Sequence, residues 1–114
     1  MPNKYILRFR QIDKRVFKDI KTGKKTVETR AATIKFKNII LGDIIVFVCG
    51  KEKFKKKVKR VQTFKSIFAL LDEYKVKDIM PHLSSREELE KSYYKYPNYK
   101  EKIKKFGLIV LELE

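Results

Sequence analysis

The chain has 114 residues, a formal net charge of +15 and 43% apolar residues, among them eight Phe and six Tyr. This length allows one compact domain, and this apolar content allows a packed core, which excludes a disordered chain. No apolar run approaches the roughly 18–20 residues that span a bilayer, and the first residues do not read as a signal peptide. The single Cys49 and single His82 exclude an internal disulfide and a zinc site. We expect one cytoplasmic domain over residues 1–114, with no cofactor, no structural metal and no membrane contact.

The positive charge is unevenly distributed. Residues 1–60 carry 19 Lys or Arg against 5 Asp or Glu, whereas residues 61–114 carry 10 against 9. Lys outnumbers Arg by 23 to 6, a bias that AT-rich codon usage also produces. Codon usage alone would spread the lysines evenly, so the asymmetry favours a polyanion as partner for the first half of the chain.

The start of the chain predicts a strand followed by a helix. Residues 4–10 alternate in the manner of a strand, with the apolar side chains at odd positions on its inner face. The spacing then becomes helical, with Asp13 suited to the N-cap and Gly23 to the left-handed position after the last turn. The expected apolar stripe of this helix comprises Ile12, Val16, Phe17 and Ile20.

Three further strands are expected before residue 61. Residues 25–31 are rich in β-branched side chains, and the apolar run at residues 43–48 is typical of a buried strand. A hairpin turn is expected at residues 49–51, with Cys49 as a buried, inert thiol. Residues 53–60 then form a strongly basic strand, whose imperfect alternation leaves its register open.

The second half predicts short helices and a closing strand. One apolar helical stripe comprises Phe64, Ile67, Phe68 and Leu71. A helical turn is expected to stop near Pro81, and Ser85 with Glu88 has the spacing of a capping box. Residues 106–114 return to strand alternation, with Ile109, Leu111 and Leu113 expected to face inward. About five or six strands and three or four short helices favour an α+β fold, a small β-barrel flanked by helices.

The segment T-G-K-K-T-V-E-T-R at residues 22–30 is the candidate site. On the strand expected here Glu28 and Arg30 project to the same face, because side chains alternate along a strand. Lys25 is out of phase and joins them only if the turn at Gly23 aims it there. Lys24 and Lys25 beside that turn would place cations and backbone amides at one rim, which suits a phosphate. The plainer alternative is a surface ion pair, worth about 0–1 kcal/mol.

The spacing G-x-K-x-x-E-x-R, formed by Gly23, Lys25, Glu28 and Arg30, resembles the signature of the ASCH domain family of PUA-like domains. The run L-G-D-I-I-V-F at residues 41–47 is similar to that family's G-D-x-I-x-F strand. Further similarity to small stand-alone archaeal and bacterial members covers nearly the whole chain. The resemblance implies a PUA-like β-barrel with a cleft lined by the signature residues, and a role in binding RNA or a nucleotide.

The first functional hypothesis is an RNA- or nucleotide-binding module. In its cleft, beside Gly23, Lys24 and Lys25 would contact phosphate, Glu28 would accept hydrogen bonds from a base or sugar, and Arg30 would hold Glu28 in place.

A nucleic-acid surface would extend this site along the basic strand. Lysines there would neutralise phosphates and give salt-dependent affinity. The residues of this surface are Lys53, Lys55, Lys56, Lys57, Lys59 and Arg60. Aromatic side chains near charges, at Phe54, Tyr93, Tyr94 and Tyr96, are candidates for stacking unpaired bases. A merely solvated strand and core tyrosines at helical spacing are the competing interpretations.

The alternative hypothesis is a small hydrolase that acts on a modified nucleoside or on RNA, with Lys25 and Glu28 in its active site. Some bacterial members of the ASCH family, which this sequence resembles, are amidohydrolases that use a lysine, a threonine nucleophile and an acid. Lys25 matches the lysine, but Glu28 occupies the position of the threonine nucleophile, so Glu28 would have to act as a general base on water. His82 is expected to be a surface or packing residue. The cognate ligand and the oligomeric state stay open.

Overall fold

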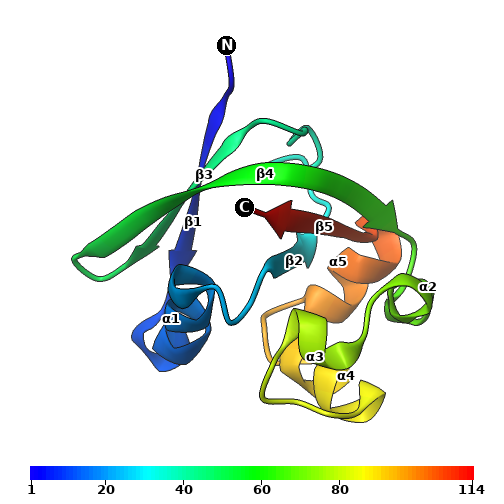
Figure 1. The fold of residues 1–114 in the computed structure, drawn as a ribbon. Helices are drawn as coiled ribbons and strands as arrows, with labels where there is room; N and C mark the ends of the chain where they lie inside the picture. Colours follow the sequence, from blue (N-terminus) through cyan, green and yellow to red (C-terminus); the bar gives the residue numbers. More distant parts are fainter.

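Alternating apolar side chains build a five-stranded sheet with the order β1-β3-β4-β5-β2 (Figure 1). A computed structural model describes residues 1–114. The strands are β1 (Lys4–Phe9), β2 (Val27–Ala31), β3 (Ile44–Cys49), β4 (Glu52–Phe64) and β5 (Leu108–Leu113). The helices are a 3₁₀ turn (Gln11–Asp13), α1 (Lys14–Thr22), α2 (Ile67–Glu73), α3 (Val76–Ile79), α4 (Arg86–Tyr94) and α5 (Tyr99–Phe106).

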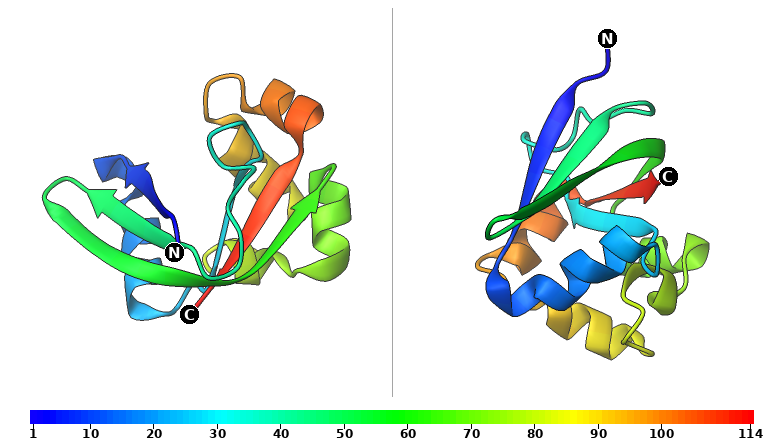
Figure 2. Two further views of the ribbon diagram at one scale, coloured as in Figure 1. Left: turned by 90° about the horizontal axis from the view of Figure 1, so that it is seen from above. Right: turned by 60° about the vertical axis from the view of Figure 1, so that its left-hand side comes forward.

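The sheet curls into a half-barrel, which Figure 2 shows from two further sides. The strand β1 pairs with β3 in parallel, and all other pairs are antiparallel. The long strand β4 pairs first with β3 and then with β5, and its register shifts between Val58 and Arg60. A bulge of this kind bends a strand and increases its twist, so the sheet curls at this point. The bulge also shifts the inward apolar positions of β4 from Phe54 and Val58 to Val61.

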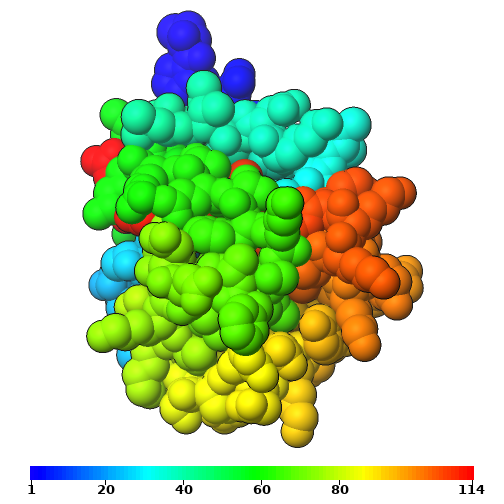
Figure 3. Space-filling model, turned by 90° about the vertical axis from the view of Figure 1, so that its right-hand side faces the viewer, coloured from blue at the N-terminus to red at the C-terminus, as the bar shows by residue number.

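The predicted α+β class with a small barrel is confirmed, although the barrel is half open because the outer strands β1 and β2 are not hydrogen-bonded to each other. The helix α1 lies beside β1 and β2, and α2 to α5 form a separate helical layer (Figure 1). In Figure 3 this layer and the end of β4 occupy one continuous face of the molecule. No helix is both long enough and apolar enough to cross a membrane.

The strand β5 separates two hydrophobic cores. Ile109, Leu111 and Leu113 face the core inside the half-barrel, where they join inward residues of β1, β3 and α1. Leu108 and Val110 face the second core, under the helical layer. Both faces of β5 are therefore buried, which explains the apolar run from Leu108 to Leu111.

Several sequence-based assignments of the helices are wrong in detail. Ile12 is 82% exposed, because it lies in the 3₁₀ turn before α1 and not on the helix's apolar stripe. Phe64 ends β4, where it pairs with Leu108. Phe68 is 65% exposed, and Leu70 takes the buried position on α2 instead. The structure also has five α-helices, because residues 99–106 form α5, a helix with only one buried residue, Ile103.

Other local predictions are confirmed. Gly23 follows α1 in the left-handed conformation, with φ of 83°. Ser85 and Glu88 form the capping box of α4, and Cys49 is a buried free thiol. Asp43, which carries no predicted role, is also buried, and its carboxylate accepts hydrogen bonds from the backbone N–H groups of Asn3 and Ile40 at 3.0 and 2.9 Å. It thereby fixes the entry to β3.

We predict that two glycine substitutions differ sharply in cost. Gly23→Ala meets no atom within 4 Å and should cost about 1–2 kcal/mol for its left-handed backbone alone. At Gly107, with φ of 79° and ψ of −170°, a Cβ would lie 2.4 Å from the backbone oxygen of Phe64. Gly107→Ala should therefore cost about 3–5 kcal/mol. Urea unfolding of both variants measures the difference, and equal costs would contradict the packing of β5 against β4.

Candidate functional site

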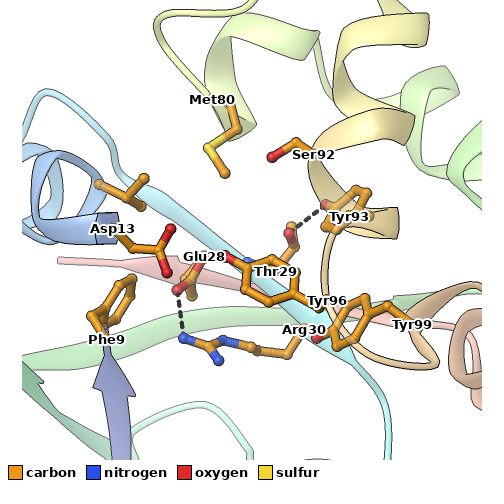
Figure 4. A pocket seen from close by; sticks show the side chains of 11 residues that line it. Phe9, Asp13, Glu28, Thr29, Arg30, Met80, Ser92, Tyr93, Tyr96 and Tyr99 are labelled. Carbon is orange, nitrogen blue, oxygen red and sulfur yellow. Dashed lines mark hydrogen bonds and ion pairs between the residues drawn. The ribbon is translucent and has the colours of Figure 1, made fainter. Parts of the chain in front are cut away.

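A pocket lies where β2 passes between α1 and the helical layer (Figure 4). Its cavity volume is about 60 Å³, so the enclosed part is small, and the pocket opens to solvent. Its lining residues are Phe9, Asp13, Val16, Glu28, Thr29, Arg30, Met80, Ser92, Tyr93, Tyr96 and Tyr99. Six of these eleven residues are hydrophobic, so the pocket combines an apolar wall with a few polar groups.

The carboxylate of Glu28 forms the polar floor of this pocket and is only 5% exposed. Its Oε1 accepts a hydrogen bond from the backbone N–H of Thr29 at 3.0 Å and lies 3.7 Å from Nζ of Lys25. Its Oε2 lies 3.4 Å from Nη2 of Arg30. A carboxylate has about four acceptor positions, so about one remains for a ligand.

Lys25 approaches Glu28 from the interior of the protein. The strand starts only at Val27, and the turn after Gly23 directs the Lys25 side chain inward, where it is 2% exposed. Its ammonium group donates to the backbone carbonyls of Val27 and Ile79 as well as pairing with Glu28. Burial lowers the pKa of Lys25, although the carboxylate of Glu28 opposes this effect. The ammonium of Lys25 therefore makes two hydrogen bonds and one ion pair inside the protein.

Lys25 is not among the residues that line the pocket, so this geometry gives no support to the predicted phosphate contact of its ammonium. Gly23 and Lys24 are exposed and do not line the pocket. Arg30 is the signature cation that does reach the pocket, with 24% of its side chain exposed. Its guanidinium lies 5.1 Å from the ring centre of Phe9 while it contacts Glu28, as Figure 4 shows.

Aromatic side chains from three parts of the chain line the rest of the pocket. Tyr93 is buried, and its hydroxyl shares a hydrogen bond with Oγ1 of Thr29. The ring centre of Tyr99 lies 6.3 Å from that of Tyr93 and 5.4 Å from that of Tyr96. Burial raises the pKa of all three tyrosines, so their hydroxyls stay neutral near pH 7. Tyr93 is thus a core residue that also lines the pocket.

The other two aromatic candidates do not line the pocket. Phe54 stacks on Phe47 inside the half-barrel, at 5.0 Å between ring centres, and Tyr94 is 41% exposed outside the pocket. Sequence reasoning missed Phe9, which belongs to a strand pattern that reads as core, and Tyr99, which lies in the helix α5 that the sequence did not predict.

At the mouth of the pocket Arg10 connects α1 to the aromatic wall. Its Nε donates to the carboxylate of Asp13 at 2.8 Å, and its guanidinium lies 4.9 Å from the ring centre of Tyr96. Asp13 occupies the expected N-cap position of α1, but its side chain makes no capping hydrogen bond. It faces the pocket instead (Figure 4).

The predicted basic surface divides between the two faces of β4. Three of its lysines, Lys53, Lys55 and Lys57, are exposed on the outer face of the half-barrel, and Lys59 is exposed at the bulge. Lys56 is half-buried on the opposite face, opposite Ile45. Arg60 lies 3.6 Å from Glu112 in an ion pair.

The pocket with Glu28 and Arg30 at its floor, on a curled α+β half-barrel, agrees with the kind of domain that the resemblance of the sequence implies. The family model described as ASCH domain matches residues 11–114, and the chain belongs to this family. No curated protein matches the chain. No group of three or more His, Cys, Asp or Glu side chains is arranged to hold a metal ion.

Two solved structures are similar over nearly their whole length. One, the crystal structure of hypothetical protein PH0355, is 32% identical with a TM-score of 0.83, and the match covers 97% of each chain. The other, the solution NMR structure of protein PF0455 from Pyrococcus furiosus, is 28% identical with a TM-score of 0.76. That match covers 97% of this chain and 96% of the other.

We predict that removing the buried ammonium destabilises the fold far more than removing its neighbour. Lys25→Met leaves Glu28 buried beside one partner fewer and two carbonyls without a donor, and should cost about 3–5 kcal/mol. Lys24→Met, at an exposed position, should change the free energy of unfolding by no more than about 0.5 kcal/mol. Urea unfolding measures both.

The double variant Lys25→Met/Glu28→Gln serves as the control for charge, because it removes the unpaired carboxylate as well. Its free energy of unfolding should recover part of the loss. An additive or larger loss in the double variant would contradict the pairing of these two groups.

Proposed function

We propose that the protein binds RNA or a nucleotide, with one unstacked base in the pocket. The observation that carries this proposal is the polar pair of Glu28 and Arg30 at the floor of an aromatic pocket. Membership in the ASCH family supports it, because the resemblance of the signature residues implied RNA or nucleotide binding.

The floor offers a base one acceptor beside several donors. Glu28 has about one free acceptor position, which suits an amino or ring N–H group of a base. Arg30 uses one of its five N–H donors on Glu28, so others are available for a carbonyl oxygen or ring nitrogen. A base edge that carries a donor next to an acceptor therefore complements this pair.

The walls supply the stacking surfaces. Phe9, Tyr96 and Tyr99 line the pocket, and each base–aromatic contact contributes about 1–3 kcal/mol. Because all three rings are packed against other side chains, little conformational entropy is lost when a base enters.

The outer face of the half-barrel is the proposed path for a phosphate backbone. Lys53 and Lys57 on β4 lie across β3 from Arg8 and Lys4 on β1, by the register of the two strand pairs. Arg8 precedes Phe9 of the pocket and Arg10 of its mouth, so the two regions meet at the end of β1. Arg8 and Lys4 are additions that the sequence pattern alone did not identify.

The hydrolase alternative needs both Lys25 and Glu28 in the active site, and this geometry provides only Glu28. Lys25 is too deeply buried to touch a ligand, so only Glu28 would remain for acid–base chemistry, and it is already held by three donors. Binding is the function that this arrangement favours.

A Glu28→Gln variant tests base recognition. Replacing one carboxylate oxygen with an amide donor should lower the affinity for the preferred nucleoside about tenfold or more. The ratio of this affinity to the affinities for the other three nucleosides should fall as well. Glu90→Gln, which changes a surface carboxylate 3.5 Å from Arg86, is the matched control. Calorimetric titration with the four common nucleosides measures this. An equal loss for every nucleoside would point to structural damage and count against recognition by Glu28.

Salt dependence tests the outer face. A triple variant Lys53→Gln/Lys55→Gln/Lys57→Gln should reduce the slope of log affinity against log salt for short single-stranded RNA by about 2, at about 0.7 per lost phosphate contact. The control variant Lys65→Gln/Lys75→Gln/Lys77→Gln removes the same charge from exposed positions near the helical layer and should change the slope much less. Equal slopes for the two variants would sink the claim for this face.

A further inference from the structure

The aromatic pocket continues into a second compartment. This compartment has a cavity volume of about 140 Å³, and it shares five lining residues with the first. The shared residues are Asp13, Val16, Met80, Ser92 and Tyr96. The two compartments therefore form one groove between α1 and the segment from α3 to the end of α4.

The second compartment is lined by two cationic side chains and a histidine, which come from three separate parts of the chain. Arg15 lies on α1, His82 between α3 and α4, and Lys95 directly after α4. No carboxylate lies within 4 Å of Arg15, His82 or Lys95 in an ion pair. By contrast, Arg30, which lines the first compartment, and Arg10, which contacts its residues Asp13 and Tyr96, are both paired with a carboxylate.

The electrostatic environment of His82 reports the same excess of positive charge. Burial is the main cause that lowers its pKa, and Arg15, Lys95 and Lys25 lower it further. Asp19 on α1 is the acid that opposes them. Three unpaired cationic or protonatable groups around one hollow are suited to a dianionic group such as a phosphate.

The junction between the compartments carries groups of a different kind. The carboxylate of Asp13 and the hydroxyl of Ser92 approach the groove from opposite sides, as Figure 4 shows. Arg10 neutralises Asp13 at 2.8 Å, so the carboxylate does not exclude an anionic ligand from the groove. Carboxylate and hydroxyl oxygens at this position can accept hydrogen bonds from sugar hydroxyls.

We propose that the groove binds a phosphorylated ribonucleoside, with its base on the Glu28–Arg30 floor, its ribose between Asp13 and Ser92, and its phosphate in the Arg15–His82–Lys95 compartment. This inference rests on the proposed function and adds the ligand class and its orientation. The linear order of aromatic, hydroxyl-binding and cationic regions matches the order of base, sugar and phosphate. The phosphate belongs either to a free mononucleotide or to one unit of an RNA chain.

The test uses calorimetric titration of the full chain with the four common nucleosides and with their 5′- and 3′-monophosphates. For the preferred base, at least one monophosphate should bind about tenfold tighter than the nucleoside, a difference typical of a charge-assisted contact. The variant Arg15→Gln/Lys95→Gln should reduce this advantage to about threefold or less while the nucleoside affinity stays unchanged.

The matched control is Lys18→Gln/Lys91→Gln, which removes two charges from exposed positions on α1 and α4, outside both compartments. It should keep the full phosphate advantage. An equal loss in both variants, or a wild-type protein that binds nucleoside and monophosphate equally, overturns the phosphate compartment and leaves the base pocket intact. A wild-type protein that binds none of these ligands overturns the base pocket as well.

Two further probes separate the sources of the phosphate and test the sugar. If a trinucleotide of the preferred base binds tighter than the monophosphate, and Arg15→Gln/Lys95→Gln removes this difference, the phosphate belongs to an RNA chain. A monophosphate that binds tighter supports a free nucleotide. The 2′-deoxy monophosphate should bind several-fold more weakly, and equal affinity for ribose and deoxyribose overturns the placement of the sugar between Asp13 and Ser92.

Discussion

The site depends on one buried ammonium group. A charge inside a protein is tolerated only when its hydrogen-bonding groups are satisfied, and Lys25 meets this condition with two backbone carbonyls and the carboxylate of Glu28. One of these carbonyls belongs to Ile79 at the end of α3, so the same group ties the helical layer to β2. Because this contact fixes the carboxylate from below, Glu28 presents its remaining capacity to the pocket in a defined direction.

The curled sheet determines where that pocket lies. The two faces of β5 carry separate cores, and β2, its outer neighbour, runs between α1 and the helical layer. Since β1 and β2 do not pair, the half-barrel stays open on this side, and the floor residues of β2 remain accessible from the groove. The bulge in β4 curls the sheet, and the pocket is accessible because the curled sheet does not close.

Features that depend on local patterns could be predicted from the sequence. Strand alternation identified the inward residues of β1 and β5, and turn and cap chemistry identified Gly23 and the capping box at Ser85. Features that depend on distant partners could not. The carbonyl that accepts from Lys25 is 54 residues away, and α5 has Ile103 as its only buried residue, which gives no helical period to detect. The clustering of Phe9 with Tyr96 and Tyr99 likewise requires the tertiary fold.

The same distinction applies to charge. A net charge of +15 indicates affinity for polyanions but does not say which cations are free to provide it. Lys25 satisfies internal groups, Arg30 pairs with Glu28, and Arg60 pairs with Glu112, although all three belong to conspicuous basic stretches. Arg15 and Lys95 lie in unremarkable sequence, yet the fold brings them to one hollow without a carboxylate partner. A cation without a carboxylate partner beside a cavity can pair with an anionic ligand. The position of such unpaired cations, and not the density of lysines in the sequence, identifies the groove.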